Sequence, residues 1–272
     1  MDRAKTETGG TGITMNTDLF NLAGRTAVVV GGTSGIGQAI ALGLAAAGAD
    51  VIATSRRLNE VKDTAAKIAA LGRRTIGLQA DVMDRESLQA LHDAVLGSFG
   101  GADILVNSAG ITQRVATLQC TEADWNRIIE TNLTGTLRAC QIFGRTMVQQ
   151  GHGRIVNIAS LATFVAFHEV AAYGASKAGV GSLTRSLAIE WAKDGVCVNA
   201  IAPGIFRTAL NEELLDKTAR GQELLMRTPM KRFGATDELV GAAIFLASEA
   251  ASFVTGQILT VDGGYMASGV NQ

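Results

Sequence analysis

A glycine-rich turn near the start of the chain most constrains the fold. The apolar run TAVVV at residues 26–30 passes directly into GGTSGIG at 31–37, and a helical pattern covers 35–47. Glycines let the backbone turn sharply and bring its N–H groups close to a phosphate, and the positive end of the following helix adds to the attraction. The turn predicts a dinucleotide site, and the alternative is a plain strand-to-helix connection.

Short apolar runs and amphipathic helical stretches alternate along the rest of the chain. Strands that alternate with helices favour a parallel sheet with helices on both faces. We therefore predict an α/β fold, a single doubly wound Rossmann-type domain with a seven-stranded parallel sheet. The expected strands are 26–30, 50–54, 75–80, 103–107, 154–159, 197–202 and 257–261, and the expected helices include 35–47, 58–71, 84–99 and 121–150.

Two segments stand apart from this alternation. Residues 1–18 lack an apolar core and are expected to form a disordered extension before a catalytic domain at 19–272. Residues 206–232 are helical but do not lead directly into a strand. Because ligands bind beyond the carboxyl ends of parallel strands, we expect 206–232 to be a helical lid. The alternative is a fixed cover whose leucines belong to the permanent core.

Composition excludes several classes of partner. The formal net charge of the 272-residue chain is -1, which argues against nucleic acid. No apolar run is long enough to span a membrane. The three cysteines have no metal-ligand spacing and are expected to be small buried hydrophobes in a reducing compartment. We expect a cytoplasmic protein that acts on a small molecule and uses no metal.

The end of the second strand bears on the choice between NAD and NADP. Folds that prefer NAD usually place a carboxylate there to bind the ribose diol. Here the residue is Ser55, and Arg56 and Arg57 follow it. Guanidinium groups match phosphate geometry, so the sequence favours NADP(H) over NAD(H). The alternative is that both arginines are simply solvated.

The stretch YGASK at residues 173–177 places a tyrosine and a lysine four positions apart. On a helix these side chains share a face. A tyrosine has an ordinary pKa of about 10 and gives up its proton poorly at neutral pH. A neighbouring ammonium favours the tyrosinate, so Lys177 is expected to lower the pKa of Tyr173 and fit it for acid–base catalysis.

Six motifs in order resemble the short-chain dehydrogenase/reductase family over about residues 19–265. They are the glycine turn, NSAG (107–110), TNLTG (131–135), IAS (158–160), YGASK and APGIFRT (202–208). The resemblance implies an NAD(P)-dependent oxidoreductase that interconverts a ketone and a secondary alcohol, and it implies a homotetramer. The implied catalytic residues are Asn132, Ser160, Tyr173 and Lys177, with Ser160 holding the carbonyl oxygen and Asn132 orienting a water beside Lys177.

Contacts with the dinucleotide are expected along one edge of the sheet. Two positions, Val30 and Ser108, depart from the family pattern, and they bear on local stability more than on activity. The expected cofactor residues are Gly31, Ser34, Gly35, Ile36, Gly37, Ser55, Arg56, Arg57, Asp81, Val82, Asn107, Ala109, Gly110, Tyr173, Lys177, Pro203, Gly204, Ile205 and Thr208.

The substrate is less constrained than the reaction. The segments 18–25, 227–248 and 261–264 resemble gluconate 5-dehydrogenases and related sugar-acid or polyol dehydrogenases. Arg114 is a candidate for a substrate carboxylate, and His168, Ser160 and Tyr173 are further candidate substrate contacts. One alternative is a 3-oxoacyl-[acyl-carrier-protein] reductase. Another is a regulator that binds the dinucleotide without turnover.

Overall fold

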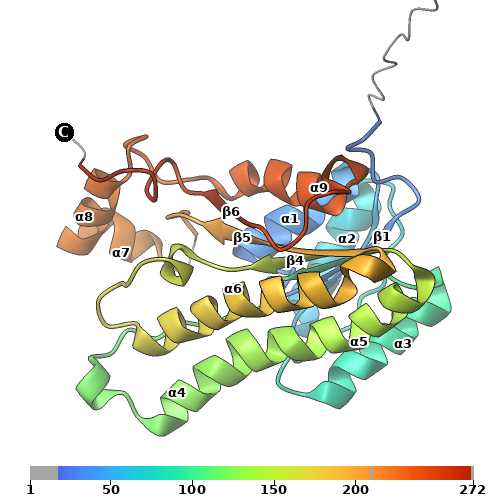
Figure 1. Cartoon of the computed structure of the whole chain (residues 1–272), viewed down its shortest axis with the longest axis horizontal. Helices are drawn as coiled ribbons and strands as arrows, with labels where there is room; N and C mark the ends of the chain where they lie inside the picture. Colours follow the sequence, from blue (N-terminus) through green and yellow to red (C-terminus); the bar gives the residue numbers. More distant parts are fainter. Residues whose placement is uncertain (1–17, 209–210, 271–272) are drawn as a thin grey trace, which may run out of the picture.

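The computed structural model describes residues 18–208 and 211–270, so the extension expected over 1–18 lies, except for Asp18, outside the described residues. The described strands form one six-stranded parallel sheet in the order β2-β1-β3-β4-β5-β6 (Figure 1). The expected doubly wound α/β fold is confirmed. The strands are β1 (Thr26–Val30), β2 (Asp50–Thr54), β3 (Ile104–Asn107), β4 (Gly153–Ile158), β5 (Val196–Pro203) and β6 (Ile258–Val261).

The expected count of seven strands is wrong. Residues 75–80 run beside β2 but form no regular ladder with it. The Val51 N–H donates to the Arg74 carbonyl at 3.1 Å, and the Ala80 N–H donates to the Ser55 carbonyl at 3.1 Å. Between these two bonds, the Thr54 hydroxyl donates to the Leu78 carbonyl at 2.7 Å. A side chain therefore takes the place of a backbone partner, and the segment stays irregular.

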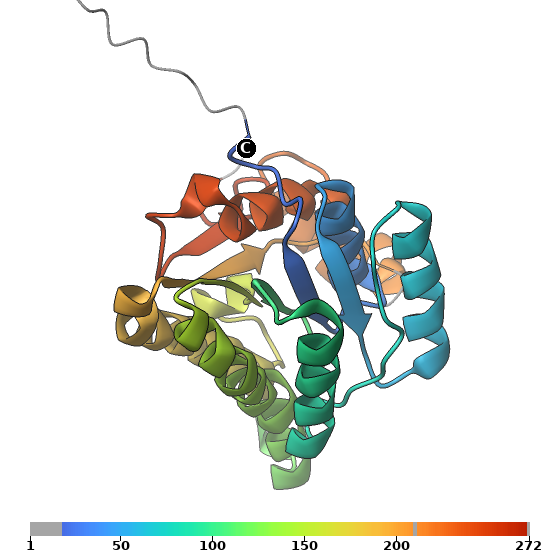
Figure 2. The same cartoon turned by 90° about the vertical axis from the view of Figure 1, so that its right-hand side faces the viewer.

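Helices cover both faces of the sheet (Figures 1 and 2). Residues of α1, α2 and α9 join one buried apolar cluster, and residues of α3, α5 and α6 join the other. The helices are α1 (Gly35–Ala46), α2 (Leu58–Ala70), α3 (Arg85–Phe99), α4 (Glu122–Ile129), α5 (Gly135–Gln150), α6 (Ala171–Trp191), α7 (Glu212–Lys217), α8 (Ala219–Arg227) and α9 (Val240–Ala247).

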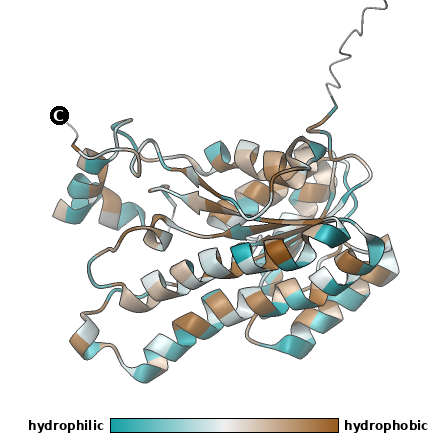
Figure 3. Ribbon diagram, viewed as in Figure 1, coloured by the Kyte–Doolittle hydropathy of each residue, from teal (hydrophilic) through white to brown (hydrophobic). Residues whose placement is uncertain are grey.

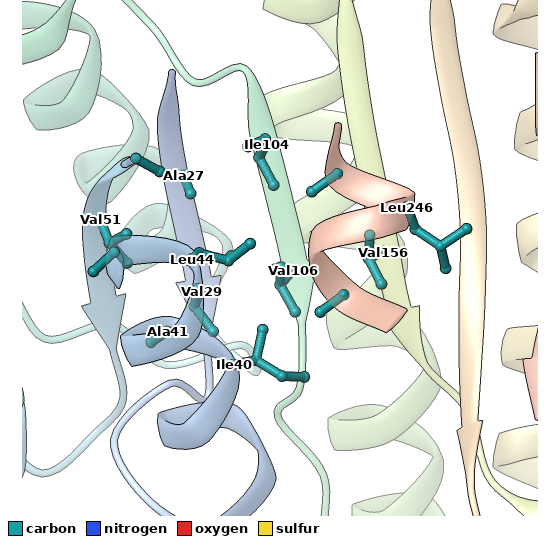
Figure 4. Packing of buried hydrophobic residues seen from close by; sticks show 14 of the residues in the cluster. Ala27, Val29, Ile40, Ala41, Leu44, Val51, Ile104, Val106, Val156 and Leu246 are labelled. Atoms are coloured by element: carbon teal, nitrogen blue, oxygen red, sulfur yellow. The ribbon is translucent and has the colours of Figure 1, made fainter. Parts of the chain in front are cut away.

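The two apolar clusters follow from the two-residue period of the strands. Along β1, Ala27 and Val29 enter the cluster beneath α1, whereas Val28 and Val30 enter the opposite one. Both sets are buried, which explains why the strands are largely apolar rather than alternating, with Arg154, Asn157 and Asn199 as buried exceptions (Figure 3). Figure 4 shows the α1 side, where Ile40, Ala41 and Leu44 lie over β1, β2 and β3.

The helical segment expected at 206–232 contains α7 and α8, which follow the carboxyl end of β5 (Figure 1). Leu215 of α7 and Leu224 of α8 are buried with Leu161 and Tyr265 in a small apolar cluster. The segment therefore rests on the loop after β4 and on the last residues of the described chain. This packing is compatible with a closed lid and with a fixed cover.

The cysteines differ in burial. Cys140 of α5 is fully buried, and burial raises the pKa of its thiol to about 12. It is the small hydrophobe that the sequence predicts. Cys120 and Cys197 are only half-buried, so the prediction is wrong for them. Both lie at the start or end of an element, where the chain reaches the surface.

The turn between β1 and α1 generates a first prediction. A Cβ on Gly37 would lie 2.1 Å from the Gly31 carbonyl oxygen, which is closer than any real contact. We expect Gly37→Ala to lower the free energy of unfolding by about 1–3 kcal/mol, the usual cost of overpacking. Gly97→Ala is a matched control on α3, since a Cβ there meets nothing within 4 Å.

The control should raise the stability by roughly 0.5–1 kcal/mol, because alanine is the better helix former. Urea unfolding followed by tryptophan fluorescence measures both changes. Equal stability of the two variants would show that the turn relaxes around the added methyl group and is not tightly packed.

Candidate active site

The carboxyl ends of the first three strands converge on the glycine turn. The N–H groups of Gly31 and Gly32 donate to the Thr54 carbonyl at the end of β2, at 2.8 and 3.1 Å. The Ser108 N–H, just after β3, donates to the Val30 carbonyl at 2.8 Å. The residues expected to contact the dinucleotide near β1, β2 and β3 therefore lie side by side.

Missing side chains make this convergence possible. Gly31 has φ +78°, and a Cβ there would lie 2.5 Å from the Ala109 backbone nitrogen. Gly35 has φ +50° and begins α1, where the first turn carries no acidic side chain. The N–H groups of this helix start are therefore presented without a competing carboxylate, as an anion site requires.

The later expected contacts lie around the same edge. A Cβ on Gly35 would lie 3.6 Å from Thr208 Cγ2, so the turn after β5 faces the glycine turn. Asp81 accepts the Met83 N–H at 3.0 Å, and the neighbouring Val82 is buried against Gly135 at the start of α5. Among the expected cofactor residues, Val82, Asn107 and Pro203 are buried inside the fold.

The four expected catalytic residues come from three elements and meet beside Gly110. Tyr173 and Lys177 lie one turn apart in α6, with the Lys177 ammonium 5.8 Å from the Tyr173 ring centroid. Ser160 follows β4 and hydrogen-bonds the Tyr173 side chain. A Cβ on Gly110 would lie 3.4 Å from Asn132 Oδ1 and 3.6 Å from Lys177 Nζ.

Lys177 is buried, and within residues 18–208 and 211–270 its ammonium donates one hydrogen bond. Its side chain lies inside the fold, with 5% of the residue exposed, and its Nζ donates to the Ile158 carbonyl at 2.7 Å. An ammonium has three donors, so this bond leaves two for other partners. Burial lowers the pKa of Lys177 to about 8. The group is charged at neutral pH and loses its charge in the mildly alkaline range.

The pKa of Tyr173 is raised, whereas the sequence analysis expected it to be lowered. Burial raises it above its ordinary value, and the hydrogen bond with Ser160 lowers it by less. The prediction that Lys177 lowers the pKa of Tyr173 is therefore not met in the net direction, because desolvation of the phenolate outweighs the opposing effect. Tyr173 is protonated at neutral pH, and that is the form that donates a proton.

Asn132 occupies a π-helical segment, Glu130–Thr134, between α4 and α5. Its Oδ1 accepts the Ile111 N–H at 2.8 Å, and its Nδ2 donates to the Ile111 carbonyl at 2.8 Å. Nδ2 also donates to Ser176 Oγ at 3.0 Å, and the Ser176 hydroxyl donates to the Tyr173 carbonyl at 2.7 Å. The carboxamide thus fastens the loop after β3 to the first turns of α6. Its role toward a water stays a prediction.

The candidate substrate residues Arg114 and His168 share an unexpected partner. Arg114 Nε lies 2.5 Å from Glu169 Oε2, and His168 Nδ1 lies 3.6 Å from the same oxygen. Arg220 of α8 donates to the His168 carbonyl at 3.1 Å. Glu169 has φ +66°, a left-handed conformation that is uncommon for this residue type. The sequence analysis missed Glu169, which lies four residues before Tyr173.

An apolar wall continues from this loop. Phe167 packs against Tyr265 with ring centroids 6.2 Å apart. Phe164 and Val165, in the same loop, are exposed at 45% and 36%. Within the described residues no group of three or more His, Cys, Asp or Glu side chains is placed to hold a metal ion. Over the same residues, no helix is both long and apolar enough to cross a bilayer.

Comparisons with known proteins agree with this geometry. A family model described as enoyl-(acyl carrier protein) reductase matches residues 30–266. The 2-dehydro-3-deoxy-D-gluconate 5-dehydrogenase of Dickeya dadantii (strain 3937) is 41% identical over 249 residues, which cover 91% of this chain and 98% of that protein. The chain belongs to the short-chain dehydrogenase/reductase family.

Other members of the short-chain dehydrogenase/reductase family are similarly close. The 3-oxoacyl-[acyl-carrier-protein] reductase FabG of Escherichia coli (strain K12) is 38% identical, and the alignment covers 90% of this chain and 98% of that protein. A gluconate 5-dehydrogenase from Burkholderia cenocepacia J2315, solved in complex with NADP and tartrate, is 39% identical with a TM-score of 0.89. That match covers 92% of this chain and 98% of the other.

The described residues fit the nicotinamide dinucleotide on which the family depends. Gly35 carries no side chain, and its Cβ would contact Thr208 Cγ2 at 3.6 Å, so a pyrophosphate at the start of α1 would lie against the Thr208 side chain. The two remaining donors of Lys177 suit ribose hydroxyls. The residues expected to hold the cofactor lie along the carboxyl edge, where Val82, Asn107 and Pro203 are buried, and their contacts with a dinucleotide stay a prediction.

The buried ammonium generates a second prediction. Its pKa falls from 10.5 to about 8, and each pKa unit corresponds to about 1.4 kcal/mol. Burial of the charge thus costs about 3 kcal/mol at pH 7, and the bond to Ile158 offsets about 1 kcal/mol of it. We expect Lys177→Met to raise the free energy of unfolding by about 1–2 kcal/mol.

The pH dependence of stability shows whether burial of the Lys177 charge destabilises the fold. Below pH 8 the lysine is charged in both states and the full cost is present. Between pH 8 and 10.5 the folded protein loses the proton first, so the difference between Lys177→Met and the unsubstituted protein shrinks. Lys62→Met, at an exposed position of α2, should change stability little at any pH. A less stable Lys177→Met variant would show that the hydrogen bond outweighs desolvation.

Proposed function

We propose that the protein is an NAD(P)-dependent oxidoreductase that interconverts a ketone and a secondary alcohol, with Tyr173 as the acid–base group. One observation carries the proposal. The phenol of Tyr173 is hydrogen-bonded to Ser160 and set one helical turn from the buried ammonium of Lys177, at the sheet edge that the glycine turn occupies. A tyrosine, an alcohol and a cation in this arrangement suit an oxygen that gains or loses a proton.

Each side chain has a separate task in reduction. Ser160 donates to the substrate oxygen and holds it beside Tyr173. Tyr173 is protonated at neutral pH and donates its proton to that oxygen as negative charge develops there. Lys177 supplies positive charge that stabilises the tyrosinate left behind. A bound nicotinamide ring supplies or receives the hydride.

The same groups set the preferred pH of each direction. Oxidation needs Tyr173 as a base, and its raised pKa makes that form scarce at neutral pH. Reduction needs the protonated phenol and a charged Lys177, and Lys177 loses its charge above a pH of about 8. Reduction is therefore favoured near neutrality. Oxidation gains from the tyrosinate that forms as the pH rises, but it loses the stabilising charge of Lys177 above a pH of about 8.

For the substrate, we propose a sugar acid, a polyol or a related carbonyl compound. Relatives with such names support it, since a 2-dehydro-3-deoxy-D-gluconate 5-dehydrogenase and a gluconate 5-dehydrogenase align over nearly the whole chain. Arg114 remains the candidate ligand for a substrate carboxylate. Because Glu169 already pairs with this guanidinium, an acidic substrate has to compete with an internal carboxylate.

The acyl-carrier-protein alternative rests on the similarity to FabG. A reductase of that kind needs free cations beside the cleft for an acidic carrier protein. Two basic groups near the start of α6 already have partners, Arg114 in Glu169 and Arg220 in the His168 carbonyl. Because the pairing of Arg114 bears equally on an acidic sugar substrate, the substrate panel has to separate the two alternatives. The non-catalytic alternative is disfavoured because Tyr173 and Lys177 are both present and correctly spaced.

We further propose that NADP(H) is preferred to NAD(H), on the basis of Arg56 and Arg57 at the end of β2 and the NADP bound by the gluconate 5-dehydrogenase relative. Residues 206–232 are proposed to cover the cofactor and substrate, with Leu215 and Leu224 as the apolar underside. The cytoplasmic location expected from the sequence stays a prediction.

A substrate panel tests the proposal. Nicotinamide absorbance is followed with sugar acids, polyols, acetoacetyl thioesters and simple ketones, each with NADP(H) and NAD(H). Turnover of sugar acids or polyols at the highest kcat/KM supports the proposed substrate. A preference for acetoacetyl thioesters supports the carrier-protein alternative. Dinucleotide binding without turnover of any compound supports the regulator.

The role of Tyr173 generates a third prediction. Tyr173→Phe removes the transferable proton and keeps the ring, so kcat should fall by about a hundredfold or more, the usual contribution of general acid–base catalysis. Cofactor affinity, measured by fluorescence titration, should stay within about twofold because the backbone and Lys177 are unchanged. The remaining tyrosine, Tyr265, provides a matched Tyr→Phe control that should retain most of the activity. A Tyr173→Phe variant with more than a tenth of the normal rate contradicts the assigned role.

The outer helices generate a fourth prediction, a homotetramer with closed two-fold symmetry. The apolar residues Ile142, Phe143 and Leu187 of α5 and α6 are buried inside one chain and do not support assembly. Two other features support assembly, a side chain of α6 (Ile189) that is 82% exposed and a hollow of about 510 Å³ lined by residues of α3, α5 and α6. Light scattering at micromolar concentration should give four times the chain mass. A stable monomer contradicts the prediction.

A further inference from the structure

The structure brings a carboxylate to the end of β2 that the sequence pattern did not reveal. Glu60 lies in the first turn of α2, five residues after Ser55. Its Oε2 accepts a hydrogen bond from Thr33 Oγ1 at 3.2 Å, and Thr33 Oγ1 also lies 2.8 Å from Ser55 Oγ. Thr33 belongs to the glycine turn and is 4% exposed. Glu60 is thus tied to the expected adenosine end of the cofactor site.

The same carboxylate neutralises one of the two candidate phosphate ligands. Arg57 Nη2 lies 2.7 Å from Glu60 Oε2, with the arginine side chain 66% exposed and the glutamate 33% exposed. Arg56, its neighbour, is exposed and makes no hydrogen bond or ion pair within residues 18–208 and 211–270. The two arginines expected to act together therefore differ. Arg56 offers a free guanidinium, and Arg57 already has an anionic partner.

The ion pair between Arg57 and Glu60 also has an ordinary structural explanation. Glutamate and arginine three residues apart on a helix often form a surface contact of little energetic value. That explanation accounts for the ion pair but not for the hydrogen bond to Thr33, which lies 27 positions earlier in the chain. The bond to the buried threonine holds the carboxylate against the glycine turn, where it faces the strand end rather than open solvent.

We propose that Glu60 is a specificity-determining residue for the adenosine end of the dinucleotide. Its carboxylate replaces the one that Ser55 lacks and accepts a hydrogen bond from the ribose diol of NAD(H). With NADP(H), the Glu60 carboxylate repels the 2′-phosphate. It also keeps Arg57 in an ion pair, so that Arg56 is the main ligand of the phosphate. The inference rests on the proposed function. It implies that the preference for NADP(H) over NAD(H) is small and that the protein accepts both cofactors.

Two fragments that lack the nicotinamide test this directly. Adenosine 2′,5′-bisphosphate reports on the phosphate subsite, and AMP reports on the ribose diol. Titration calorimetry on the full chain gives Kd for each. Glu60→Gln should tighten the bisphosphate about fivefold, as expected for removing about 1 kcal/mol of repulsion between partly solvated charges, and should weaken AMP slightly. Glu122→Gln, an exposed residue in the first turn of α4, is the matched control and should change neither value.

The arginines supply the sharper part of the test. Arg56→Ala should weaken the bisphosphate at least about tenfold, the loss expected for one charged hydrogen bond, and leave AMP unchanged. Arg57→Ala should cost the bisphosphate about twofold or less in the normal protein but about tenfold in the Glu60→Gln background, because only there is Arg57 released to bind phosphate.

The outcomes are separable. If Arg57→Ala costs the same in both backgrounds, or if Glu60→Gln changes both fragments equally or neither, the proposal for Glu60 is overturned while the dinucleotide site stands. If neither fragment binds the normal protein, the dinucleotide site itself is absent, and the proposed function fails together with this inference.

Discussion

The close approach of the β1–α1 turn to the loop after β3 is the constraint on which the site depends. A side chain on Gly31 or Gly37 would collide with backbone atoms, 2.5 Å from Ala109 and 2.1 Å from Gly31 respectively. Because this approach is possible, the ends of β1, β2 and β3 share one short edge. The helix start of α1 and the polar residues after each strand then face a common space without any long loop.

Burial of Lys177 lowers the stability of the fold. A lysine inside a protein loses favourable hydration, and Lys177 retains one hydrogen bond, to Ile158. Its ammonium lies 5.8 Å from the centroid of the Tyr173 ring, close enough for the role proposed for it. Burial has the opposite effect on Tyr173 itself, whose pKa rises. Desolvation therefore raises the pKa of Tyr173 and lowers the pKa of Lys177. At neutral pH both groups are protonated, which is the state that the proposed reduction needs.

Local sequence patterns predicted most of the strands and helices because these depend on period, whereas the four expected catalytic residues came from the resemblance to the family's ordered motifs. Strand 26–30 and the one-turn separation of Tyr173 and Lys177 are visible in the residues themselves. The failures have another origin. Residues 75–80 have the composition of a strand, but the Thr54 side chain replaces part of their ladder. The partners Glu60 and Glu169 were missed because each acts on a residue of a different segment, and no periodicity records such a contact.

Both ends of the site share one arrangement, an arginine paired with an internal carboxylate. Arg57 pairs with Glu60 at the expected cofactor end, and Arg114 pairs with Glu169 near the start of α6. An anionic ligand at either place gains only the difference between its own contacts and the pair it disrupts. The proposed function therefore implies that a weakly bound anion is rejected, whereas a ligand that also contacts the free guanidinium of Arg56 is retained. Selectivity at such a site comes from the competing carboxylate as much as from the arginine, which explains why positive charge alone is a poor guide to what this protein binds.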